Sequence, residues 1–101
     1  MNEKPVRCAD ALLILRGCKS ELALRYGVTS LGLFGSVARD QATENSDIDV
    51  VVRLSQPDLF AMVHIKDVLQ QALGRRVDLV HYRERMNAFL KKRIDENAVY
   101  A

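Results

Sequence analysis

The sequence has few cysteines, almost no net charge and no long hydrophobic run. Its 101 residues include two cysteines, Cys8 and Cys18, and two histidines, His64 and His81. No Cys-x-x-Cys pair is present, so a zinc site lacks a ligand set and we expect both cysteines to be reduced, packed thiols. Fifteen Lys and Arg residues against thirteen Asp and Glu leave a net charge of +2. This balance is too small for a dedicated nucleic-acid-binding protein, so we expect no direct contact with nucleic acid.

Membrane and secretion signals are also missing. No segment has the run of about 18 uncharged apolar residues that a membrane span needs, and residues 1–5 lack the apolar core of a signal peptide. We therefore expect a cytoplasmic protein. Hydrophobic residues make up 49% of the chain and charged residues 28%, which predicts a single globular domain over residues 1–101. A chain this short has little room for a deep substrate pocket.

The spacing of the apolar residues predicts alternating helices and strands. The predicted elements are a helix over 6–26, a strand over 29–34, a short helix over 37–39, a strand over 48–54, a helix over 59–73, a strand over 77–82 and a helix over 84–96. The order is α-β-α-β-α-β-α, which predicts an α/β (α+β) fold with a small mixed sheet. With three visible strands, we expect the helices to cover one face of the sheet and the other face to stay open.

Two carboxylates share one face of the strand over 48–54. Side chains alternate along a strand, so Asp47 and Asp49 point the same way, with Cα atoms about 6.6 Å apart. The opposite face is entirely aliphatic and must pack against helices; it consists of Ile48, Val50, Val52 and Leu54. The two aspartates therefore lie on the open face.

A bound divalent cation would explain why two carboxylates lie side by side on this strand. Two neighbouring anions repel each other, whereas Mg²⁺ is commonly held by one or two carboxylates together with substrate phosphates. Asp78 lies in the strand over 77–82, and it joins Asp47 and Asp49 if the two strands are neighbours. Three carboxylates and a nucleoside triphosphate need about two divalent ions, the arrangement used for in-line phosphoryl displacement.

The turn at Gly35-Ser36 supplies a possible grip for phosphate. A glycine after a strand lets backbone N–H groups approach phosphate oxygens at the start of a helix, and the Ser36 hydroxyl can donate to the same oxygens. Arg39 lies one turn further on and can bind phosphate with two parallel hydrogen bonds. The alternative, which the sequence supports equally, is that Arg39 is an ordinary surface residue.

The pattern Gly35-Ser36, ten residues, Asp47-x-Asp49 and a later Asp78 resembles the DNA polymerase beta-like nucleotidyltransferase superfamily. The short chain is similar to its minimal nucleotidyltransferase (MNT) branch, over about residues 22–100. The resemblance implies that Gly35 and Ser36 grip the triphosphate of ATP, that Asp47 and Asp49 bind two Mg²⁺ ions, and that Asp78 binds one of them and helps activate the incoming hydroxyl. In a departure from the family, Asp40 stands where many relatives have glycine, and it adds a negative charge near the phosphate turn.

The resemblance also implies a partner and a reaction. MNT proteins are commonly antitoxins paired with a HEPN-domain RNase toxin, and several transfer AMP from ATP to a tyrosine of that toxin. The alternative is an antitoxin that neutralises the toxin by binding alone. Transfer to a small molecule or an RNA end is a third hypothesis, but relatives of that kind usually carry an additional helical domain.

The remaining polar residues are assigned ordinary structural roles. We expect His64 at the surface and His81 packed with the apolar side of its strand. The run Lys91-Lys92-Arg93 is predicted to be a solvated face; the functional alternative is contact with an acidic partner surface or with RNA held by a partner. The last helix carries an apolar stripe that is either core or partner interface, and we assign most of it to the core. It runs over Met86, Phe89, Leu90, Arg93 and Ile94.

Overall fold

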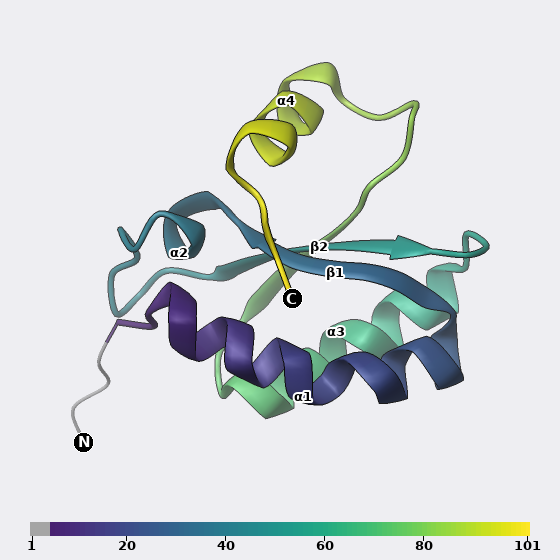
Figure 1. Cartoon of the computed structure of the whole chain (residues 1–101), viewed down its shortest axis with the longest axis horizontal. Helices are drawn as coiled ribbons and strands as arrows, with labels where there is room; N and C mark the ends of the chain where they lie inside the picture. The colour runs from purple at the N-terminus through teal and green to yellow at the C-terminus, as the bar shows by residue number, and fades with distance from the viewer. Residues whose placement is uncertain (1–4) are drawn as a thin grey trace.

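A computed structural model describes residues 5–101 of the chain. The elements of this part follow the predicted alternation and end with an additional short strand (Figure 1). In chain order they are α1 (Cys8–Tyr26), β1 (Val28–Phe34), α2 (Gly35–Ala38), β2 (Ile48–Leu54), α3 (Leu59–Leu73), β3 (Val77–His81), α4 (Ala88–Asn97) and β4 (Val99–Tyr100).

Local signals fix the ends of the long helices. The Asp58 carboxylate accepts hydrogen bonds from the backbone N–H groups of Phe60 and Ala61, at 2.9 and 3.2 Å, and so caps the start of α3. Helix α3 stops at Gly74, where φ is +67°, and α1 stops at Gly27, where φ is +72°. Glycine adopts this left-handed conformation without the steric penalty of a side chain.

The strands form one mixed sheet in the order β3-β2-β1-β4. β1 runs antiparallel to both β2 and β4, while β2 and β3 are parallel. Helices α1 and α3 cover one face of this sheet, and α4 lies over the other (Figure 1). The predicted fold class is therefore confirmed.

The face under α1 and α3 holds most of the core. Its strand side chains are those that alternation in the sequence predicted for β2, together with Val28, Leu31 and Leu33 of β1 and Val77 of β3. Helix α1 contributes Leu15 and Leu22, and α3 contributes Ile65 and Leu69, all of them fully buried. Burying side chains of this kind contributes roughly 1.5–3 kcal/mol each, so this layer is the main source of stability.

Two predicted details of the sheet were wrong. A fourth strand, β4, pairs with Gly32 and Leu33 of β1. A Cβ built on Gly32 would lie 2.8 Å from both the Tyr100 ring and the Val99 carbonyl oxygen, so the close approach of β4 requires glycine there. The second face is also not fully open, because α4 covers part of it.

Helix α4 is attached to the second face by a small apolar cluster. Ile94 is fully buried there with Phe34 and Val51, which confirms the predicted core role for that part of the stripe, while Phe89 is 74% exposed. The helix begins later than predicted, since the side chain of Asn87 caps it by accepting a hydrogen bond from Leu90 N at 3.0 Å.

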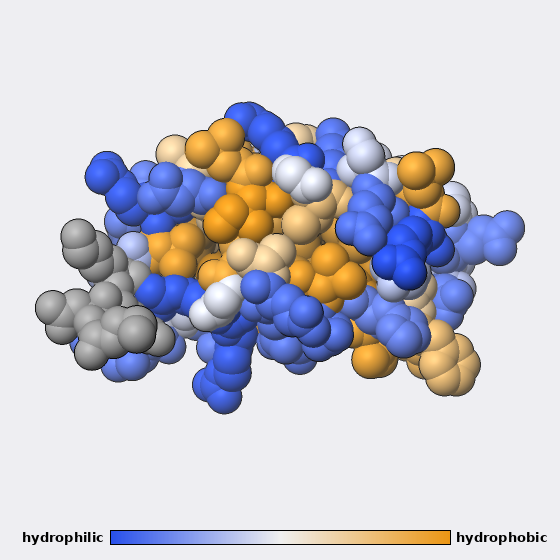
Figure 2. Space-filling view, turned by 90° about the horizontal axis from the view of Figure 1, so that it is seen from below, coloured by the Kyte–Doolittle hydropathy of each residue, from blue (hydrophilic) through white to orange (hydrophobic). Residues whose placement is uncertain are grey.

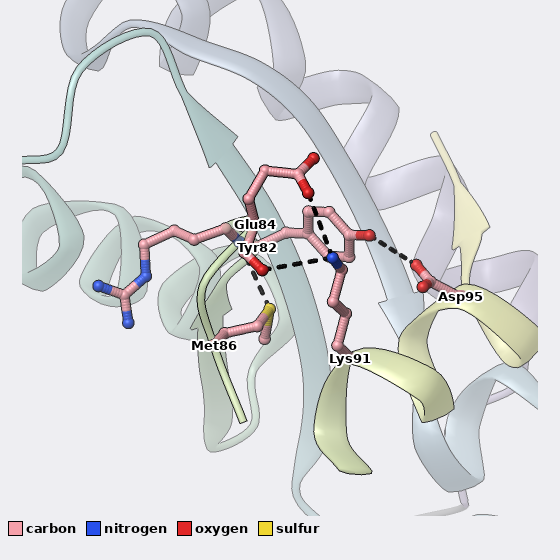
Figure 3. Close-up of polar contacts among 6 residues, drawn as sticks. Tyr82, Glu84, Met86, Lys91 and Asp95 are labelled. Carbon is pink, nitrogen blue, oxygen red and sulfur yellow. Dashed lines mark hydrogen bonds and ion pairs between the residues drawn. The ribbon is translucent and has the colours of Figure 1, made fainter. Parts of the chain in front are cut away.

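Polar contacts around Tyr82 hold the loop between β3 and α4 (Figure 3). The Tyr82 hydroxyl donates to Asp95 Oδ1 at 2.8 Å, and this hydrogen bond, followed by burial, raises the pKa of Tyr82. Lys91 of α4 forms an ion pair with Glu84 at 3.3 Å. The guanidinium of Arg53 lies 4.2 Å from the centre of the Tyr82 ring, in a cation–π arrangement.

The histidines and cysteines have the environments expected of them. His64 is exposed and stacks on Tyr26, while His81 is half-buried and its Nε2 accepts a hydrogen bond from Leu54 N at 3.3 Å. Cys8 and Cys18 are free, half-buried thiols, and burial raises the pKa of both.

Figure 2 views the face formed by α1 and α3 and shows apolar surface over its middle. The large hydrophobic side chains exposed on these two helices are Leu13, Leu24, Leu59, Phe60 and Val63. Within residues 5–101, no helix is both long and apolar enough to span a membrane.

Candidate active site

Two of the predicted site carboxylates meet on the second face of the sheet. β2 and β3 are neighbours, and their parallel register sets Asp49 directly beside Asp78. Both side chains lie on the α4 side, because Val51 and Val80, two residues further along each strand, belong to the cluster under α4. Asp49 is half-buried and Asp78 is exposed.

The carboxylate of Asp49 packs against the glycine of the predicted phosphate turn. A Cβ built on Gly35 would overlap Oδ2 of Asp49, and the φ of Gly35 is +72°. Glycine is therefore required twice at this position, for the backbone conformation and for the space. The Gly35-Ser36 part of the sequence pattern is thus in direct contact with its Asp-x-Asp part.

The turn after β1 carries groups that can bind an anion. Ser36 is half-buried in α2, and among the described residues its hydroxyl has no hydrogen-bond partner. The Ser36 carbonyl accepts hydrogen bonds from Arg39 N at 3.2 Å and Gln41 N at 2.8 Å, which folds the chain back beneath the turn. Within the described part of the chain, no side chain caps the start of α2.

Asp47 lies just before β2 and faces a different partner. Its Oδ1 forms an ion pair with Arg76 Nε at 3.4 Å, and both side chains are largely exposed. In residues 5–101 no group of three acidic, histidine or cysteine side chains comes together as a complete metal site. The structure brings Asp49 and Asp78 together and leaves Asp47 beside them.

The electrostatics of the carboxylate pair favour a bound cation. Burial raises the pKa of Asp49, the negative charges of Asp78 and Asp47 raise it further, and the positive charge of Arg93 lowers it. Carboxylates held this close repel each other until a cation neutralises them. Mg²⁺ usually takes one or two protein carboxylates and completes its shell with water and substrate phosphates, so the Asp49–Asp78 pair fits this ion.

Asp40 binds the start of α1. Its φ is +53°, a left-handed conformation that aspartate tolerates better than most residues. Its Oδ1 accepts a hydrogen bond from Cys8 N at 2.7 Å, at the start of α1. The carboxylate thus caps α1 from a distant part of the chain.

The sequence did not single out Arg93 as a site residue. Arg39, the predicted phosphate ligand, is exposed at the end of α2, whereas the positive charge that acts on Asp49 comes from Arg93. Arg93 lies 44 positions after Asp49 in the numbering, and only the packing of α4 against the sheet brings the two together.

Comparison with known proteins gives a consistent family. Residues 15–101 match the family described as nucleotidyltransferase domain. A protein of Methanocaldococcus jannaschii, provisionally named a protein adenylyltransferase, is 41% identical over 88 residues, which are 86% of this chain and 90% of that protein. Protein adenylyltransferase MntA of Thermococcus cleftensis is 43% identical over 68 residues, covering 66% of this chain and 69% of its own length.

Solved structures with a similar fold include toxin–antitoxin complexes. A toxin–antitoxin structure with AMP-PNP matches with a TM-score of 0.68 and 25% identity, over 83% of this chain and 69% of that chain. A second match is to a Shewanella oneidensis complex of a tri-AMPylated HEPN toxin with an MNT antitoxin. Its TM-score is 0.65 with 23% identity, over 89% of this chain and 70% of that chain, so this likeness is one of fold.

Proposed function

Since the chain belongs to the nucleotidyltransferase domain family, we propose that it transfers AMP from ATP to a tyrosine hydroxyl of a HEPN-domain toxin. In this role it is the antitoxin of a two-protein pair, working as a single domain in the cytoplasm, where ATP is available. The observation that carries the proposal is the Asp49–Asp78 pair on adjacent strands, with Gly35 packed against Asp49.

Each site residue has a role in the proposed transfer. Asp49 and Asp78 would hold Mg²⁺, and Asp47 would join them on leaving Arg76; the ions supply charge neutralisation on the triphosphate. The Gly35-Ser36 turn would hold the β- and γ-phosphates, with Arg39 beside it. The tyrosine oxygen bonds to the α-phosphorus, the bond from that phosphorus to the bridging oxygen breaks, and pyrophosphate leaves. The hydroxyl proton passes to Asp78, the exposed carboxylate of the pair.

Two lines of comparison support the nucleotide and the partner. Relatives that share 41% and 43% identity carry the name protein adenylyltransferase, one of them provisionally. Proteins of similar fold occur with AMP-PNP and with a HEPN toxin. The acceptor side also needs a second protein, because on this chain the carboxylate pair is bordered by α4 and otherwise faces outward.

A second candidate function is neutralisation of the toxin by binding alone. The ion pair between Asp47 and Arg76 favours it, because a carboxylate engaged with an arginine is not free to hold a metal. The charge of Asp40 no longer favours it, since that carboxylate caps α1.

The two functions are separated by a labelling experiment. The chain, its partner toxin, Mg²⁺ and ATP labelled on the α-phosphate are incubated, and the label is followed onto the partner. We expect transfer by the wild type and its loss in the double variant Asp47→Asn, Asp49→Asn. Undiminished transfer by that variant, or no transfer by the wild type, would contradict the proposed reaction. A variant that still protects cells without labelling would support neutralisation by binding.

A further inference from the structure

Helix α4 carries a cationic side chain to the candidate site. Ile94 anchors the helix between Phe34, the residue before the phosphate turn, and Val51, two residues beyond Asp49. Helix α4 also contacts α2, which holds the turn itself. The residue before this anchor is Arg93, so the packing of Ile94 holds the Arg93 backbone near both halves of the site.

The two lysines that precede Arg93 on α4 each lie within ion-pair distance of a glutamate. Lys91 is paired with Glu84 at 3.3 Å, and Lys92 lies 4.0 Å from Glu96, one turn along the same helix. Among the described residues, the guanidinium of Arg93 makes no hydrogen bond or ion pair. The backbone carbonyl of this residue accepts a hydrogen bond from Asn97 Nδ2 at 3.2 Å. Arg93 is exposed, on the helix that covers the Asp49 side of the sheet.

We propose that Arg93 binds the triphosphate of the nucleotide, contacting the β- or γ-phosphate between Asp49 and the Gly35-Ser36 turn. This inference rests on the proposed function, because it assumes the same nucleotide site. An arginine suits the position because its planar group can give two parallel hydrogen bonds to phosphate oxygens. The same contact stabilises the pyrophosphate as it leaves, which is where negative charge increases during transfer.

The test measures binding separately from transfer. The full chain is titrated by calorimetry with Mg²⁺–AMP-PNP and, in parallel, with AMP, for the wild type and the variants Arg93→Gln, Arg93→Lys and Lys92→Gln. Lys92→Gln is the matched control, since it removes the same charge from the adjacent position of the same helix. Amide and aromatic circular dichroism and the urea midpoint verify that each variant folds.

We expect Arg93→Gln to weaken Mg²⁺–AMP-PNP binding about ten- to a hundredfold, as for the loss of a hydrogen bond to a charged group, with AMP binding changed by less than about twofold. Arg93→Lys should recover part of the loss, and Lys92→Gln should bind as the wild type does.

Three results would overturn the inference: unchanged binding by Arg93→Gln, an equal loss for AMP, or an equal loss in Lys92→Gln, which would indicate a net-charge effect. The transfer assay reports on the proposed function independently. A wild type that binds Mg²⁺–AMP-PNP through Arg93 but never labels the partner would contradict the proposed function and leave the role of Arg93 standing.

Discussion

The two faces of the sheet differ in how much of the chain holds them together. Within residues 5–101, sixteen buried residues form the cluster between the sheet and helices α1 and α3, whereas three buried residues, Phe34, Val51 and Ile94, form the cluster under α4. The candidate site lies on the second face. The main core and the candidate site therefore lie on opposite faces of the sheet. Because few buried contacts hold α4, this helix is the element best able to move without unfolding the rest.

Two isoleucines of equal burial test this difference most strongly. Ile65 of α3 and Ile94 of α4 are both fully buried, but they lie on opposite faces. We expect Ile65→Ala to lower the free energy of unfolding by about 2–5 kcal/mol. Ile94→Ala should cost less, because α4 can detach locally, and urea unfolding measures both.

Hydrogen exchange then identifies where each variant opens. In Ile94→Ala the amides of α4 should exchange faster while those of α1 and α3 keep their protection. Equal losses of stability in the two variants, or faster exchange throughout Ile94→Ala, would show that the two faces unfold as one unit.

Two glycines in the same left-handed conformation provide a second, smaller test. Among residues 5–101, a Cβ at Gly74 would meet no atom within 4 Å, whereas one at Gly35 would overlap the Asp49 carboxylate. Gly74→Ala should therefore cost only backbone strain, about 1 kcal/mol, and leave AMP transfer unchanged. Gly35→Ala should cost about 1–3 kcal/mol and reduce transfer about a hundredfold, because the carboxylate is displaced.

The comparison needs both unfolding and labelling measurements on the two variants. If Gly74→Ala lost as much transfer as Gly35→Ala, then strain in the backbone, and not the contact with Asp49, would be responsible.

The smallest of the expected effects concerns the pH dependence of stability. The raised pKa of Asp49 means that the folded protein holds this proton more tightly than the unfolded chain does. Stability from this group is therefore full below its ordinary pKa of 3.8 and is lost as the pH rises through the raised folded value. Asn cannot ionise, so Asp49→Asn should gain stability relative to the wild type over this window.

Urea unfolding in EDTA at a series of pH values measures the gain. EDTA matters because a bound cation would reverse the sign by stabilising the ionised carboxylate. A wild type that becomes more stable than Asp49→Asn as the pH rises would contradict the repulsion inferred for the metal-free site.

The fold was predictable where periodicity is strong and local. The bounds of β2 and α3 agree with prediction, because alternating aliphatic residues and the Asp58 and Gly74 ends define them. Strand β4 was missed because two residues carry no periodicity, and its pairing with Gly32 is set by tertiary contact. The first turn predicted for the last helix proved to be loop, since Asn87 caps a later start.

The sequence predicted which residues belong to the candidate site better than it predicted their contacts. Alternation placed Asp49 on the correct face of β2, and the neighbouring register of Asp78 followed from the strand order. The partner of Asp47, Arg76, lies on a different segment and could not be inferred from spacing. Arg93 could not be identified for the same reason, because a run of three cations on a helix gives no indication of which one lies nearest the site.

The parallel pairing of β2 and β3 also determines which insertions and deletions the protein can tolerate. The backbone hydrogen bonds between β2 and β3 fix the register that sets Asp78 beside Asp49. A longer or shorter α3, which connects the two strands, would therefore leave the two carboxylates aligned. One extra residue inside β3 ahead of Asp78 would instead turn that side chain to the face under α1 and α3. Variation in length should therefore accumulate in the connecting helix and be absent from these two strands.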